Sequence, residues 1–293
     1  AARYMVAAAN PLAAQAGLEI LREGGSAVDA AIAVQMVLGL VEPQSSGLGG
    51  GAFIVHYDAA SKAVQTYDGR ETAPAAATED YLRFVSATNT SAPLPNARRS
   101  GRAIGTPGTV RVLEMLHQDH GSQAWSTLFE PGRKLASDGF AISGRMADAI
   151  AGARVDLLND PDAVAYFLNP DLTPRALGTL IQNPAYADTL TQIANGGAAA
   201  FYDGAIAQDI VTEIARDAAG PNAPGPLTPG ATTLADMTGY RAVKREPVCI
   251  DYRAYRVCGM GPPSSGAIAV GQTLGILENF GMDAFGPSAI DIY

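Results

Sequence analysis

The stretch GGSAVDAAIAVQMVLGLVEP, residues 24 to 43, has the largest influence on the predicted fold. Its two glycines end a preceding helix, Ser26 is a helix N-cap with Asp29 three residues later, and Pro43 ends the helix that follows. The segment from Ala27 to Leu40 is apolar nearly all round, so we expect a helix buried on most of its faces. A buried helix so early in the chain predicts a layered fold with a central helix layer.

The neighbouring segments have clear boundaries. In chain order they predict a helix from Asn10-Pro11 to Glu23, a glycine loop from Gly47 to Gly51, a strand from Ala52 to Tyr57 and its hairpin partner from Ser61 to Asp68. Arg70 follows the second strand, and the glycine loop precedes the first. We therefore expect Arg70 and the glycine loop at the same rim of a sheet.

Most of the chain after Pro74 carries helix caps, apolar periods and glycine stops. Strands return in VCIDYRAYRVC, residues 248 to 258, which reads as two short strands around a turn at Arg253-Ala254. A Pro-Ser-Gly loop and a helix of buried character follow. No internal repeat is visible, and we expect one α+β domain over residues 1–293.

Composition excludes several classes of protein. The 293 residues are 47% hydrophobic and 17% charged, which is typical of a globular chain with a large core. The net charge of -9 argues against nucleic-acid binding, which needs a basic face. The sequence contains no run of eighteen apolar residues, so it predicts no membrane span. No signal segment is visible at the start, so we expect any signal peptide to have been removed already, with a periplasmic or secreted location.

Cys249 and Cys258 lie on the two strands around Arg253-Ala254. A two-residue turn would place them directly opposite each other, within reach of a disulfide, and a disulfide would indicate an oxidising compartment. The turn residues do not suit a two-residue hairpin, which favours two buried thiols. Both alternatives stay open.

Searches for common catalytic and cofactor motifs find none. No G-x-S-x-G nucleophile motif occurs. His56 is expected in a strand, and His117 and His120, on or after a helix end, are interpreted as solvated or capping side chains, with no metal site. The glycine loop follows a helix and precedes a strand, the reverse of a dinucleotide-binding motif, and we expect no cofactor. Its residues Gly47, Gly49, Gly50 and Gly51 are expected to line a pocket with their backbone.

Arg70 lies between two carboxylates in YDGRETAP, residues 67 to 74. Asp68 and Glu71 could simply neutralise its charge. They could also hold the guanidinium in place so that its fork receives a carboxylate from a ligand.

Five motifs in order resemble one family. They are GGSAVDAAIAV (Gly24 to Val34), SGLGGGAF (Ser46 to Phe53), DGRETAP (Asp68 to Pro74), GTPGTV (Gly105 to Val110) and PPSSG (Pro262 to Gly266). Together they resemble the large subunit of γ-glutamyltranspeptidases, which are N-terminal nucleophile hydrolases. The similarity extends from about Met5 to Asn279.

The resemblance implies an αββα sandwich, of which this chain is the larger, helix-rich part. It implies a precursor that cleaves itself before a threonine, so that a small subunit carries the nucleophile. The substrate would be glutathione or another γ-glutamyl amide, and the acceptor water, an amino acid or a peptide. Arg70 would bind the α-carboxylate of the γ-glutamyl group, with Asp68 and Glu71 fixing its orientation.

The family's Thr-Thr-His-like segment is missing from this chain, and TTL at Thr232 to Leu234 is interpreted as a helix cap. We therefore expect no catalytic residue here and no activity from this chain alone. A glutaryl- or cephalosporin-type β-lactam acylase is an alternative within the family, because its substrates also carry a terminal carboxylate. Polyglutamate-capsule processing is a weaker one. A non-catalytic binding protein with this fold is the alternative from another class.

Overall fold

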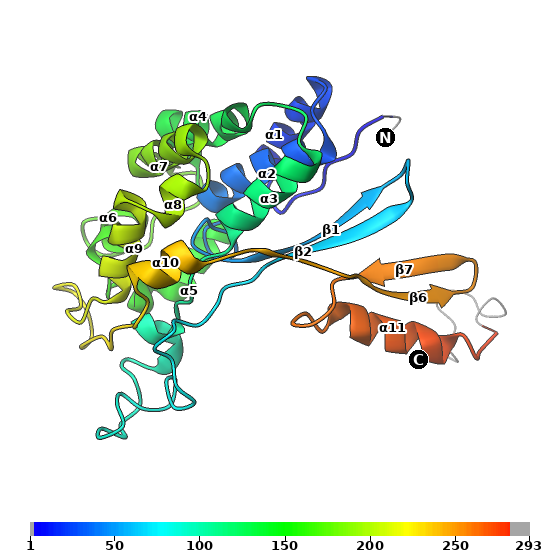
Figure 1. The fold of residues 1–293 in the computed structure, drawn as a ribbon. Helices are drawn as coiled ribbons and strands as arrows, with labels where there is room; N and C mark the ends of the chain where they lie inside the picture. Colours follow the sequence, from blue (N-terminus) through cyan, green and yellow to red (C-terminus); the bar gives the residue numbers. More distant parts are fainter. Residues whose placement is uncertain (1–2, 282–293) are drawn as a thin grey trace. The chain divides into compact units, whose positions relative to one another are not determined.

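A computed structural model describes residues 3–281 of the chain (Figure 1). Its α-helices are α1 (Pro11–Arg22), α2 (Ala27–Val41), α3 (Thr109–His120), α4 (Glu130–Asp138), α5 (Gly144–Leu157), α6 (Pro161–Phe167), α7 (Pro184–Gly196), α8 (Ala199–Tyr202), α9 (Ala205–Ile214), α10 (Leu234–Gly239) and α11 (Gly266–Leu277). Its strands are β1 (Ala52–Asp58), β2 (Ala63–Gly69), β3 (Phe140–Ala141), β4 (Leu180–Ile181), β5 (Val243–Arg245), β6 (Val248–Tyr252) and β7 (Tyr255–Gly259).

The described residues form two compact units. The helical unit comprises residues 3–51 and 70–241, and the strand unit comprises residues 52–69 and 242–281. The strand unit thus combines two stretches that are distant in sequence. One domain over residues 1–293 stays a prediction.

Helix α2 is the centre of the helical unit, as its sequence predicted. The Ser26 side chain accepts a hydrogen bond from the Asp29 N–H while the Asp29 carboxylate accepts one from the Ser26 N–H, which is a complete capping box. Nine of the fifteen residues of α2 are buried. Because the helix is apolar all round, α1 and α4 can both pack against it. A methyl group at Gly132 of α4 would lie 3.1 Å from the Met36 Cβ, so glycine permits the close approach of α4.

The sheet of the strand unit has the order β1-β2-β5. The β1–β2 hairpin is the predicted one, with Ala52 opposite Gly69 and Asp58 opposite Ala63. Strand β5 lies antiparallel on the other side of β2, with Thr66 opposite Arg245, and no local signal predicted this pairing. The ladder therefore ends at Gly69, directly before Arg70.

Strands β6 and β7 form a hairpin in which Cys249 lies opposite Cys258. Their sulfur atoms are bonded, and their Cα atoms are 4.1 Å apart. The sequence argument for two thiols rested on turn residues that do not suit a two-residue hairpin, and the chain forms this hairpin in spite of them. Arg253 adopts a φ of 53°, which a non-glycine residue rarely does, and its N–H donates to a Glu278 carboxylate oxygen at 3.1 Å. This contact stabilises a two-residue turn whose residue types do not favour it.

Helix α11 lies beside β6 and β7 (Figure 1). The sequence predicted a buried helix here, and this is wrong for the described chain, because none of the α11 residues is buried. Ala267, Gly271 and Leu274 are half-buried on one side, and Ile276 on another is 63% exposed. Its apolar composition therefore exceeds what the described residues cover. Among residues 3–281, no helix is long and apolar enough to cross a membrane.

Candidate functional site

Arg70 lines a hollow of about 640 Å³ in the helical unit. The hollow's walls come from the glycine loop, from the segment that follows β2, from residues around Tyr81 and from the stretch before α3. They are Gly49, Arg70, Glu71, Thr72, Ala73, Pro74, Tyr81, Leu82, Arg102, Ala103, Ile104 and Gly105. Arg70 and Glu71 are both exposed. The hollow thus presents charges of both signs to a ligand.

The glycine loop lines a second hollow, of about 460 Å³. Its walls are Gln35, Pro43, Gln44, Ser45, Ser46, Gly47, Gly49, Gly50, Gly51, Glu71 and Thr109. Gly49 and Glu71 line both hollows. The two hollows are therefore neighbours, and the structure brings together the glycine loop and Arg70, which the sequence had placed at one rim.

The start of α3 holds the glycine loop. The Gly50 carbonyl oxygen accepts hydrogen bonds from the N–H groups of Gly108 and Thr109, at 2.9 and 3.0 Å. These donors belong to the first turn of a helix, where N–H groups lack partners within the helix. The GTPGTV motif therefore supplies two donors that fix the SGLGGG motif.

The same stretch holds the segment after Arg70. Thr72 and Thr106 exchange two backbone hydrogen bonds, with the Thr106 N–H donating to the Thr72 carbonyl at 2.8 Å. A methyl group at Gly105 would lie 2.9 Å from the Thr72 carbonyl oxygen and 3.0 Å from the Glu71 Cβ. Glycine at position 105 is therefore required for this close approach.

Helix α10 and the residue after it anchor Arg70 from another direction. The Tyr240 hydroxyl donates to the Arg70 carbonyl oxygen at 2.8 Å. The Asp236 carboxylate accepts from the Ala75 N–H at 2.8 Å while it also completes the capping box of Thr233. Burial opposes ionisation of Asp236, but these hydrogen bonds outweigh it and lower its pKa. Thr233 is thus a helix cap, as predicted, and its helix helps to fix the Arg70 segment.

Tyr202 supports Tyr240 through a stacked pair of rings, with centroids 5.7 Å apart and planes 7° from parallel. The Tyr202 hydroxyl donates to the Pro107 carbonyl at 2.8 Å, and the Arg111 guanidinium lies 4.5 Å from the centre of its ring. Burial raises the pKa of Tyr202. Sequence reasoning missed both tyrosines as supports of Arg70, because only the fold brings them near it.

Asp68 is 7% exposed and accepts a hydrogen bond from Arg245 Nε at 2.7 Å. One oxygen of the Asp68 carboxylate therefore links β2 to β5 through Arg245. Glu71 is directed toward the glycine loop, since its Oε1 lies 3.7 Å from the position of a Cβ on Gly50. Orientation of the Arg70 guanidinium by Asp68 and Glu71 stays a prediction.

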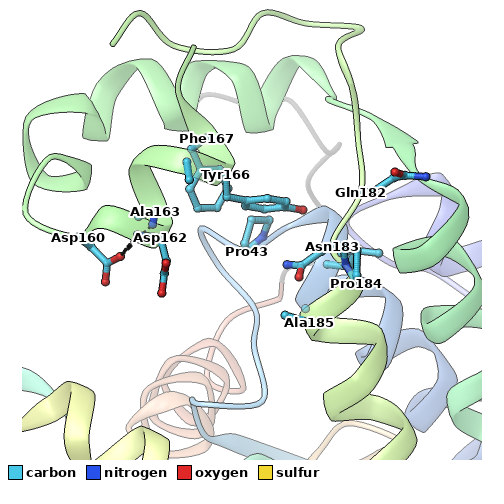
Figure 2. A pocket seen from close by; sticks show the side chains of 13 residues that line it. Pro43, Asp160, Asp162, Ala163, Tyr166, Phe167, Gln182, Asn183, Pro184 and Ala185 are labelled. Atoms are coloured by element: carbon cyan, nitrogen blue, oxygen red, sulfur yellow. Dashed lines mark hydrogen bonds between the residues drawn. The ribbon is translucent and has the colours of Figure 1, made fainter. Parts of the chain in front are cut away.

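A third hollow, of about 670 Å³, lies elsewhere in the helical unit (Figure 2). Tyr166 of α6 and Asn183 before α7 point toward it, and Asp160 and Asp162 lie at its side. The Asp160 carboxylate caps α6 through the N–H groups of Asp162 and Ala163. The Asp160 carboxylate therefore has a structural role as a helix cap.

His117 has a structural environment too. Its Nε2 lies 2.9 Å from the Gln123 carbonyl oxygen and 3.8 Å from an oxygen of Asp29, which is fully buried. Its ring meets Trp125 edge-on. These contacts join the end of α3 to the start of α2, which agrees with a packing role for this histidine.

The comparisons with known proteins cover nearly the whole chain. A family model described as Gamma-glutamyltranspeptidase matches residues 13–291. The glutathione hydrolase proenzyme of Escherichia coli (strain K12) is 36% identical over 288 residues, which are 98% of this chain and 47% of that protein. The chain therefore spans about half the length of that relative.

Solved structures of related proteins also match nearly the whole chain. The γ-glutamyltranspeptidase of Helicobacter pylori superposes with a TM-score of 0.87 and 32% identity, over 98% of this chain and 78% of that one. A cephalosporin acylase from Bacillus halodurans superposes with a TM-score of 0.80 and 27% identity, over 97% of this chain and 50% of that one. Because the family model and these proteins match nearly the whole chain, we conclude that it belongs to the γ-glutamyltranspeptidase family and has the α+β fold of N-terminal nucleophile hydrolases.

Proposed function

We propose that this chain is the large subunit of a self-processing enzyme that transfers or hydrolyses the γ-glutamyl group of glutathione or other γ-glutamyl amides. One observation carries the proposal: Arg70 is exposed in a hollow beside the glycine loop, on a backbone held by Tyr240 and by the Thr72–Thr106 pair. A guanidinium on a firmly held backbone suits bidentate recognition of the substrate's α-carboxylate.

The chemical step would belong to a small subunit from the same precursor. Its N-terminal threonine would attack the γ-carbonyl carbon, with its own α-amine taking the hydroxyl proton and passing it to the leaving amine. Water or the amine of an amino acid or peptide would then take the acyl group from the threonine oxygen. The name proenzyme given to the Escherichia coli relative supports a precursor. In this scheme Arg70 positions the acyl donor.

The exposed apolar side of α11 supports a partner chain. In this twelve-residue helix only Gln272 and Thr273 are polar, and Ile268, Val270 and Ile276 are 40%, 50% and 63% exposed. A surface helix normally has a polar face. The relative is about twice as long as this chain, so the remainder of a precursor is the natural cover for this helix.

We also propose that the enzyme works in an oxidising compartment, periplasmic or extracellular. The bond between Cys249 and Cys258 supports this location, because disulfides persist mainly outside reducing compartments.

An acylase that removes a glutaryl-type side chain from a β-lactam is the second candidate. The likeness to the cephalosporin acylase supports it, and Arg70 would suit a glutaryl carboxylate equally well. The identity to that acylase is lower than the identity to the glutathione hydrolase, which favours γ-glutamyl chemistry.

The test is intact mass and N-terminal sequencing of the whole purified protein, followed by assays with glutathione and with a glutaryl β-lactam. We expect a second chain that begins with threonine, and release of glutamate from glutathione. A β-lactam product without glutamate release would establish the acylase. A single uncleaved chain without turnover of either substrate would favour the non-catalytic binding protein.

A further inference from the structure

A second guanidinium, that of Arg102, lines the same hollow as Arg70. Three hydrogen bonds to carbonyl oxygens hold it: Nε donates to Pro229 at 2.9 Å, Nη1 to Tyr81 at 3.2 Å and Nη2 to Val85 at 2.7 Å. The guanidinium also lies 4.5 Å from the centre of the Tyr81 ring. Arg102 is therefore a rigid part of the hollow's wall.

The charge of Arg102 is balanced by no carboxylate within ion-pair distance among residues 3–281. Its hydrogen-bond acceptors are all neutral carbonyls, and they use three of the five N–H groups of a guanidinium. One N–H on Nη1 and one on Nη2 make no hydrogen bond to residues 3–281. Because the side chain is partly buried, its charge acts through a medium less polarisable than water.

The charged side chains of this hollow are Arg70, Glu71 and Arg102. Two guanidinium groups and one carboxylate make the hollow net positive on a chain whose net charge is -9. One guanidinium suffices for the single α-carboxylate of a γ-glutamyl group. A second one suits a ligand with a second carboxylate. The volume of about 640 Å³ lies in the range of pockets that hold ligands of peptide size.

We propose that Arg102 recognises the carboxylate of the leaving group, so that the preferred donors are γ-glutamyl peptides with a free C-terminal carboxylate. This inference rests on the proposed γ-glutamyl function. Arg70 binds the acyl part of the donor and Arg102 binds its peptide end. Glutathione, with a carboxylate on its glycine, belongs to the preferred class.

The experiment compares glutathione with its C-terminal amide as donors for the mature two-chain enzyme. The amide lacks only the second negative charge. We expect its KM to be about tenfold higher, which corresponds to the loss of one charge-assisted contact. Added salt should raise the KM of the acid toward that of the amide, because it screens the attraction.

Arg102→Gln and Arg102→Lys then assign the effect. Glutamine lacks the charge, so the ratio of the two KM values should fall close to one; lysine keeps the charge, so the ratio should fall only in part. If Arg102 is purely structural, Arg102→Gln raises both KM values and leaves their ratio unchanged. The matched control is Arg83→Gln, because Arg83 is a neighbouring arginine whose side chain is 71% exposed and paired with Asp80. It should leave the ratio at the wild-type value.

The wild-type comparison needs no variant, so a misfolded variant does not decide the outcome. Equal KM values for acid and amide in an enzyme that hydrolyses both would overturn the inference and leave the proposed function standing. Hydrolysis of neither donor would overturn the proposed function and the inference with it.

Discussion

The Tyr240 hydroxyl donates a 2.8 Å hydrogen bond to the backbone carbonyl of Arg70, a residue 170 positions earlier in the chain. The bond is made to the backbone of Arg70 and does not involve its guanidinium. Tyr240 itself is held by its stacking on Tyr202. The position of the proposed substrate-binding arginine therefore depends on residues from the far end of the helical unit.

Tyr240→Phe tests this dependence. Loss of one hydroxyl should cost about 1 kcal/mol of unfolding free energy. It should raise the KM for γ-glutamyl donors severalfold while kcat changes less, because Arg70 becomes less well placed. Steady-state kinetics and denaturant unfolding measure the two effects. Tyr255→Phe, at a tyrosine that is 73% exposed in the strand unit, is the control and should alter neither. A KM for Tyr240→Phe equal to wild type would contradict the positioning role.

Arg70→Ala should raise the KM for γ-glutamyl donors by about a hundredfold, because the substrate's α-carboxylate then loses its charged partner on binding. Arg70→Lys should be intermediate, since a point charge replaces the two-pronged donor. The exposed Arg22→Ala serves as the control, because Arg22 lines neither hollow. An unchanged KM for Arg70→Ala would remove Arg70 from the substrate site.

Gly105→Ala should disturb the site by steric conflict. The new methyl group would meet the Thr72 carbonyl and the Glu71 Cβ, and the backbone that follows Arg70 would have to shift. We expect a loss of about 1–3 kcal/mol of stability and a lower kcat/KM. Gly152→Ala in α5 is the matched control. A methyl group there meets nothing within 4 Å, so helix propensity should raise stability by up to about 1 kcal/mol. Equal effects of the two substitutions would refute this account.

Asp29→Asn should destabilise the helical unit. Burial opposes ionisation of Asp29, but hydrogen bonds from Ser26, Ser122 and Gln123 outweigh it and lower its pKa below the ordinary 3.8. An asparagine leaves some of these donors without an acceptor, which should cost about 2–4 kcal/mol. Thermal unfolding at neutral pH measures the loss, and the exposed Asp148→Asn is the control.

The pH dependence of stability provides a second readout of Asp29. A carboxyl whose pKa is lower in the folded state stabilises the fold while it is ionised in both states, and this contribution is lost as the pH falls through that lowered pKa. Wild-type stability should therefore decline below about pH 4, and the decline should be shallower in Asp29→Asn. Parallel acid-unfolding curves would contradict the assignment.

Ile276→Cys tests whether a partner covers α11. Ile276 is 63% exposed in this chain, and Val155 of α5 is 58% exposed. In the mature two-chain enzyme we expect maleimide to label Ile276→Cys far more slowly than Val155→Cys, and both equally after denaturation. Comparable native labelling rates would leave α11 uncovered. A photocrosslinker at Phe280 should identify a small subunit and not a second large one as the neighbour.

Local signals predicted the elements that depend on neighbouring residues. The caps at Asn10, Ser26 and Thr233 and the β1–β2 hairpin all arise from residues a few positions apart, and all are confirmed. The order of five motifs was enough for the family. These predictions required no knowledge of distant contacts.

Contacts between residues that are distant in the sequence were not predicted. Strand β5 pairs with β2, which lies far from it in the sequence. The three residues of β5 are all exposed, and so short a segment has too little pattern to predict a strand. Tyr240 and Asp236 contact the Arg70 segment only because the helical unit closes there. The apolar sequence of α11 predicted a buried helix. In the described chain none of its residues is buried, because the described residues do not cover its apolar surface.

The Gly50 carbonyl faces the first turn of α3, where it accepts two hydrogen bonds. In a trans peptide unit the C=O and the N–H point in opposite directions, and the Gly51 N–H belongs to the same unit as this carbonyl. That N–H therefore points away from α3, on a residue that lines the hollow shared with Glu71. Rotation of this peptide plane, which two glycines otherwise allow at little cost, would break both bonds. The start of a helix thus sets the direction of an amide donor beside the proposed substrate site.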